Sequence, residues 1–95
     1  MSAESKLQSK IIKYLRDKEC YVIKTRPGAG TPKGCLDIIF MLEGFWGSIE
    51  VKGSPAAKYQ PLQEETLEKL NDWSWAKRVD PTTWNEIKQE LEAML

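Results

Sequence analysis

The chain has 95 residues, and its 14 Lys and Arg balance 14 Asp and Glu, so its formal net charge is zero. This length allows one domain with a modest hydrophobic core, and we expect residues 1–95 to form a single domain. The sequence has no histidine, which excludes Ser-His and Cys-His catalysis and His-bridged zinc sites. No apolar run approaches the ~20 residues of a membrane span, and residues 1–10 lack the apolar stretch of a signal peptide. We therefore expect a cytoplasmic protein with no membrane partner, whose Cys20 and Cys35 are free thiols.

A first helix is predicted from Ser2, which can act as its N-cap, to about Lys18. Its buried stripe, spaced at i, i+4 and i+8, consists of Leu7, Ile11 and Leu15. Glu4 falls on the same stripe, so we expect a carboxylate that faces inward. The alternative explanation of Glu4 is that an acid in the first turn interacts favourably with the helix dipole.

Residues 21–26 (YVIKTR) predict the first strand, with Lys24 and Arg26 expected on the face opposite Val22. A loop over residues 27–34 follows, with three Gly and two Pro. It lacks the Gly-Lys-Ser/Thr ending of a P-loop. We interpret it as a DNA-facing loop that carries Lys33, and a plain connection remains the alternative. Gly34 would allow a backbone or a substrate to approach closely.

Two further strands are predicted over residues 36–42 and 45–52, joined in a hairpin at Glu43-Gly44. Side chains alternate between faces along a strand, so Glu50 and Lys52 are expected on one face and Val51 in the opposite layer.

Asp37 lies at the start of the strand beside the one that carries Glu50 and Lys52. We therefore expect two carboxylates and one ammonium group to meet at one end of the sheet.

The rest of the chain predicts a helix over about residues 61–70, a fourth strand over 73–79 and a final helix that opens at Asp80-Pro81. Gln63 falls in the first turn of the earlier helix, where it can reach the end of the sheet. The expected core residues of the two helices are Leu62, Leu67, Leu70, Trp84, Ile87, Leu91 and Leu95. The order α-β-β-β-α-β-α predicts an α/β fold with a mixed four-stranded sheet flanked by helices.

The residue types at the sheet end suit a divalent cation. Asp37 and Glu50 offer oxygen ligands of the kind that Mg²⁺ or Mn²⁺ prefers, and Lys52 could position a water or stabilise charge on a phosphate. This chemistry is hydrolysis of a phosphodiester. A Glu-x-Lys pattern also occurs as a salt bridge on an exposed strand, which is the alternative explanation.

The order of these motifs resembles the PD-(D/E)xK nuclease superfamily, and more closely its virus-type replication-repair nuclease (VRR-NUC) family. The matching motifs cover most of the chain and are Glu4-x-x-Leu7-Gln8, Gly34-x-x-Asp37, Glu50-Val51-Lys52, and Gln63 followed by Leu67 and Leu70. The Pro often found before the Asp of this family is Leu36 here.

The resemblance implies a restriction-endonuclease-like core and a role for each matching residue. It implies that Asp37, Glu50 and the Val51 carbonyl hold the metal, that Lys52 assists the nucleophile, and that Gln63 orients Lys52 or the substrate. Glu4 would approach the metal through water or as a ligand of a second metal. Gln60 competes with Gln63 for the position of the family's glutamine.

The resemblance also implies a substrate and an assembly. Small stand-alone members resemble phage-encoded proteins that act as homodimers on branched DNA, which predicts a metal-dependent endonuclease acting on structures such as four-way junctions. The alternatives are a non-catalytic nucleic-acid- or protein-binding domain on this fold, and a restriction-type enzyme that cuts a fixed duplex sequence.

Charge is unevenly distributed in a way that suits a phosphate-bearing substrate. Residues 1–60 carry ten Lys and Arg against six Asp and Glu, whereas residues 61–95 carry four against eight. The predicted DNA contacts are Lys24, Arg26, Lys33 and Lys58. The candidates for a dimer surface are Phe45, Trp46, Trp73, Trp75 and Trp84, of which several are alternatively core residues.

Overall fold

The fold, described over residues 2–95 by a computed structural model, is α/β with one mixed four-stranded sheet and three helices. Its elements are α1 (Ala3–Asp17), β1 (Tyr21–Lys24), β2 (Ile38–Leu42), β3 (Phe45–Val51), α2 (Gln63–Trp73), β4 (Trp75–Val79) and α3 (Trp84–Met94). The strands lie in the order β1-β2-β3-β4; β2 is antiparallel to both β1 and β3, and β4 is parallel to β3. The predicted element order is confirmed. Within residues 2–95, no helix has the length and apolar character needed to cross a membrane.

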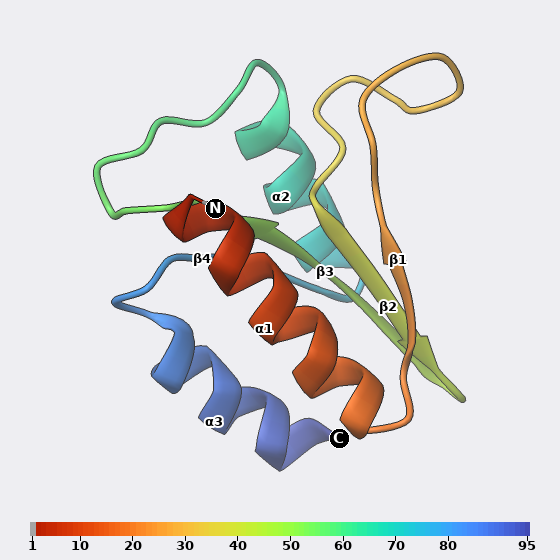
Figure 1. Cartoon of the computed structure of the whole chain (residues 1–95). Helices are drawn as coiled ribbons and strands as arrows, with labels where there is room; N and C mark the ends of the chain where they lie inside the picture. The colour runs from red at the N-terminus through yellow and green to blue at the C-terminus, as the bar shows by residue number, and fades with distance from the viewer. Residues whose placement is uncertain (1) are drawn as a thin grey trace.

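The helices cover the two faces of the sheet unequally. Helices α1 and α3 lie on one face, and α2 lies behind the sheet against β3 and β4 (Figure 1). The main core fills the first of these layers and includes Leu7, Ile11, Leu15, Ile38, Phe40, Ile49, Val51, Val79, Trp84 and Leu91. The stripe predicted for α1 is therefore confirmed, because a period of about 3.6 residues brings its three members to the sheet.

The first turn of α1 differs from the prediction at one residue. Ser2 caps the helix, since its hydroxyl accepts a hydrogen bond of 3.1 Å from the Ser5 N–H. Glu4, however, is exposed, so the expectation that it faces inward is wrong. This turn extends past the last residue of β3, and the backbone and Cβ of Glu4 lie beside Gly53 in the following loop.

Helix α2 begins and ends later than predicted. Leu62 precedes it in a left-handed conformation, with φ of 71°, and its side chain is 51% exposed. The prediction that Leu62 is a core residue is therefore wrong, because the chain is still turning at that position. Leu67 and Leu70 are half-buried. Trp73 ends the helix and is exposed, instead of starting β4.

Two loops lie at the same end of the sheet because β2 begins there and β3 ends there (Figure 1). The loops comprise residues 25–37 and 52–62. They meet at Gly34, which has φ of +79° and touches Leu62; a Cβ added at Gly34 would lie 2.7 Å from the Leu62 carbonyl oxygen. The predicted close approach at Gly34 is thus made by backbone, and it places the loop before β2 against the start of α2.

Candidate active site

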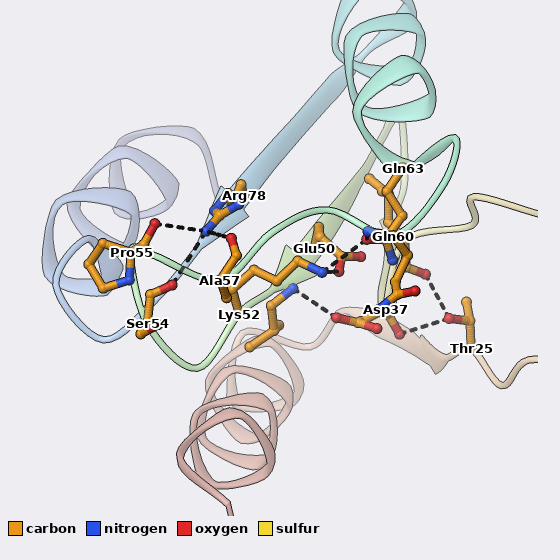
Figure 2. A network of polar contacts seen from close by, with 12 residues as sticks. Thr25, Asp37, Glu50, Lys52, Ser54, Pro55, Ala57, Gln60, Gln63 and Arg78 are labelled. Carbon is orange, nitrogen blue, oxygen red and sulfur yellow. Dashed lines mark hydrogen bonds and ion pairs between the residues drawn. The ribbon is translucent and has the colours of Figure 1, made fainter.

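The acidic and basic side chains predicted to meet at the sheet end do meet there (Figure 2). Asp37 stands immediately before β2, and its Oδ2 accepts a hydrogen bond of 2.9 Å from the Val51 N–H. Glu50 and Lys52 share the face that α2 covers, whereas Val51 points into the core under α1. The alternation predicted for residues 50–52 is therefore confirmed.

The Lys52 ammonium is held by two oxygens. Its Nζ lies 2.9 Å from Glu50 Oε2 and 2.9 Å from Gln63 Oε1, and the residue is only 5% exposed. Gln63 Oε1 also accepts a 2.8 Å hydrogen bond from the Gln60 N–H. Gln63 is therefore the glutamine that contacts Lys52, and Gln60 supports Gln63 through its backbone.

Burial gives both carboxyl groups raised pKa values. The pKa of Glu50 is raised to about 7, chiefly by desolvation and to a smaller extent by the Asp37 and Glu4 charges, while Lys52 opposes the rise. Desolvation also raises the pKa of Asp37, against the lowering effects of the Val51 N–H, Lys52, Glu50 and Lys24. A protonated Glu50 can donate a hydrogen bond to the Asp37 carboxylate, whereas two ionised groups repel each other.

When Glu50 is ionised, one of its oxygens is left without a hydrogen-bond donor or a cation. Glu50 is 1% exposed, and its Oε1 has no hydrogen-bond donor among residues 2–95. The Val51 N–H points to the side of β3 where Asp37 lies. Its carbonyl faces the same side, because the N–H and C=O of one strand residue point to the same neighbour. Glu50, Asp37 and this carbonyl therefore provide oxygen ligands that fit Mg²⁺ or Mn²⁺, which also takes water and phosphate oxygens.

Glu4 lies outside this ligand set. Within residues 2–95, no three His, Cys, Asp or Glu side chains gather closely enough to hold a metal ion together. The charge of Glu4 nevertheless raises the pKa of Glu50, so Glu4 stands near the site. Its position beside Gly53 suits an approach through water and does not support direct ligation together with Asp37 and Glu50.

A pocket of about 400 Å³ opens beside Asp37. The loop before β2 lines it with Thr25, Arg26, Thr31 and Cys35, and Gln60 and Gln63 line the other side. Thr25 is fixed in this wall, because its hydroxyl donates to the Leu36 carbonyl at 2.6 Å. The pocket gives a ligand direct access to the Asp37 carboxylate.

The four predicted DNA-contact residues are all exposed, but they lie on different surfaces. Lys24 and Arg26 line a groove with residues of α1, and Val22 packs on the core of that same layer. The expectation that they lie opposite Val22 is therefore wrong, since residues two apart on a strand share a face. Lys33 is in the loop before β2, and Lys58 is in the loop after β3.

Sequence patterns missed two residues that organise the loop after β3. The Arg78 guanidinium donates hydrogen bonds to the carbonyls of Ser54, Pro55 and Ala57, at 3.3, 3.2 and 2.6 Å (Figure 2). It also lies 4.9 Å from the centre of the Tyr59 ring, and Lys52 Nζ lies 5.9 Å from the same ring. The one available signal was an arginine within a predicted strand, which does not reveal which loop the arginine meets.

Three comparisons with known proteins, against family models, curated proteins and solved structures, found no match. The functional assignment therefore depends on the chemistry of half-buried Asp37 and of Glu50 and Lys52, which are buried beside it.

Proposed function

We propose that the chain is a metal-dependent DNA endonuclease of the PD-(D/E)xK type, similar to the VRR-NUC family. The observation that carries this proposal is the pair of carboxylates, half-buried Asp37 and buried Glu50, with Lys52 beside them and Glu50 Oε1 lacking a donor among residues 2–95. The helix, the three antiparallel strands, the second helix and the parallel fourth strand support it, because their order suits the core that the resemblance implies.

The burial of this group argues against a structural salt bridge. A non-catalytic domain predicts that Asp37, Glu50 and Lys52 form an exposed cluster, but Glu50 and Lys52 are 1% and 5% exposed. Burying an ion pair costs more desolvation energy than an exposed pair, and a second carboxylate adds repulsion. A cation beside Asp37 and Glu50 offsets both costs.

Asp37, Glu50 and the Val51 carbonyl would hold the Mg²⁺ or Mn²⁺, and Glu4 would act through water. When bound, the ion would polarise the scissile phosphate and lower the pKa of a water. Lys52 is positioned to donate from its ammonium to that water or to a phosphate oxygen. Gln63 fixes the Lys52 side chain, since its Oε1 accepts one of the ammonium hydrogens.

We further propose that the substrate is branched DNA and that the protein acts as a homodimer. One site cuts one strand, so symmetric cleavage of a four-way junction requires two copies. Two exposed aromatic residues support such an assembly, namely Tyr21 at 69% and Trp73 at 67% exposed. Trp75 and Trp84 do not serve it, because they belong to the core. This activity would take place in the cytoplasm, where DNA and Mg²⁺ are present.

A cleavage assay tests the function. Purified protein is incubated with a four-way junction, a duplex or a single strand, in Mg²⁺, Mn²⁺ or EDTA. We expect junction cleavage with either metal and none in EDTA. Asp37→Asn and Lys52→Met should abolish it, whereas Lys10→Met, which removes an exposed charge on α1, should not.

Three outcomes would contradict parts of this proposal. Cleavage in EDTA, or cleavage that survives Asp37→Asn, would refute the metal mechanism. Absence of cleavage by the wild type on all three substrates would favour the binding domain. Cutting at a fixed duplex sequence would favour the restriction-type enzyme.

A further inference from the structure

A groove of about 540 Å³ lies between α1 and the end of β1. Its charged lining comes from Lys13, Arg16 and Asp17 on α1 and from Lys24 and Arg26 at the end of β1. We call it the α1–β1 groove. Four cationic side chains and one carboxylate therefore surround a single hollow, although the whole chain is neutral.

The one acid of the groove is already paired. Asp17 Oδ2 lies 2.8 Å from Lys13 Nζ, one turn away on the exposed surface of α1. Among residues 2–95, Arg16, Lys24 and Arg26 form no salt bridge. Three exposed cations thus remain available to a negatively charged ligand.

The groove is continuous with the candidate active site. Arg26 lines both the α1–β1 groove and the pocket beside Asp37. A polyanion lying in the groove would therefore extend to the carboxylate pair.

We propose that the α1–β1 groove binds the phosphate backbone of the DNA arm next to the scissile phosphate. This proposal rests on the proposed nuclease function and adds the path of the substrate, including Arg16. The groove is lined by positively charged side chains and by no aromatic side chain. It therefore lacks the aromatic surface on which nucleic-acid bases would stack. Contacts of this kind position DNA without reading its sequence, which suits an enzyme that recognises branches.

DNA binding measured without cleavage tests the groove. A fluorescein-labelled four-way junction is titrated with protein in EDTA, and anisotropy gives the affinity at several salt concentrations. The longest dimension of the protein is 31 Å, about 9 base pairs at 3.4 Å each, so arms of about 15 base pairs exceed it. The variants are Arg16→Ala, Lys24→Ala and Arg26→Ala, with Lys10→Ala as the matched control, because Lys10 lies outside the groove, on the side of α1 next to Pro81 and Trp84.

Each groove variant should weaken binding several-fold and reduce the slope of log affinity against log salt by about 0.9, as expected for the loss of one phosphate contact. The control should keep the wild-type slope. Wild-type affinity and slope in Arg16→Ala and Lys24→Ala would overturn the proposal. Failure of the wild type to bind the junction, or groove-dependent binding of polyglutamate instead of DNA, would also overturn it.

A parallel cleavage assay in Mg²⁺ separates this proposal from the nuclease function. Binding that depends on the groove without cleavage supports the groove and contradicts the nuclease. Cleavage with wild-type binding in all three groove variants supports the nuclease and contradicts the groove.

Discussion

Replacing Glu50 by Gln should stabilise the metal-free protein at alkaline pH while destroying its metal site. Glu50 is buried beside Asp37, and the substitution keeps the shape of the side chain while removing its charge. The cause is the raised pKa of Glu50. In the unfolded chain this pKa is 4.5, and in the folded protein it is about 7.

The size and the sign of the effect follow from proton linkage. A raised carboxyl pKa means that the folded state binds the proton more tightly. The contribution of Glu50 to wild-type stability is therefore fully present below pH 4.5 and is lost as pH rises to about 7. The corresponding free energy is about 3 kcal/mol. Glu50→Gln lacks this titration, so its stability relative to the wild type should rise by about 3 kcal/mol between pH 4.5 and pH 8.

Urea unfolding in EDTA, followed by tryptophan fluorescence, measures this difference, because Trp75 and Trp84 are buried and report on the core. Adding Mg²⁺ at pH 8 should stabilise the wild type, by about 2.7 kcal/mol at one hundred times the dissociation constant. The same addition should have little effect on Glu50→Gln. Glu43→Gln, an identical change at an exposed hairpin residue, is the control.

If the wild type and Glu50→Gln differed in free energy of unfolding by the same amount at pH 4.5 and pH 8, burial would not raise the pKa of Glu50. Equal stabilisation of both proteins by Mg²⁺ or Mn²⁺ would refute the assignment of Glu50 as a ligand.

Three further predictions concern the frame around the site. Arg78→Ala should lower the free energy of unfolding by about 1–3 kcal/mol and increase hydrogen–deuterium exchange in residues 53–62. Arg78→Lys should restore only part of this loss, because an ammonium cannot replace a planar guanidinium. Gly34→Ala should destabilise more than Gly30→Ala in urea unfolding, since both have positive φ but only Gly34 meets backbone. Equal losses would contradict this contact. Burial opposes the charged form of Asp80, but hydrogen bonds from the next two threonines lower its pKa. Asp80→Asn should therefore lower the free energy of unfolding by about 1 kcal/mol at neutral pH, and this loss should shrink as pH falls below 3.8. Urea unfolding at several pH values measures it.

The parts of the fold that the sequence predicted depend on local periodicity. Leu7, Ile11 and Leu15 face the sheet because of helical spacing, and Glu50 and Lys52 share a face because strand residues alternate. The meeting with Asp37 follows from the antiparallel hairpin, whose turn determines which residues of β2 and β3 are neighbours. These features can therefore be predicted from the local sequence pattern.

The errors fall where tertiary contacts determine the conformation. Leu62 has the apolar character of a core residue, but the turn before α2 and its contact with Gly34 leave it exposed. Glu4 matches the helical stripe but lies beyond the end of the sheet that would cover it. Arg78 organises a loop more than 15 residues away in sequence, which no local pattern indicates.

The Asp37 and Glu50 pair has an energetic cost that the fold alone does not require. A small domain has a free energy of unfolding of about 5–15 kcal/mol, so about 3 kcal/mol at one carboxylate is a large fraction of it. An apolar residue at position 50 would fill the space under α2 without this cost, as Ile49 and Val51 do on the other face. Lys52 offsets only part of the cost of burying the Glu50 charge beside Asp37, since desolvation keeps the pKa of Glu50 near 7 despite the 2.9 Å contact. A bound divalent cation would offset the remainder, so binding of the metal and stability of the fold should be coupled at this site.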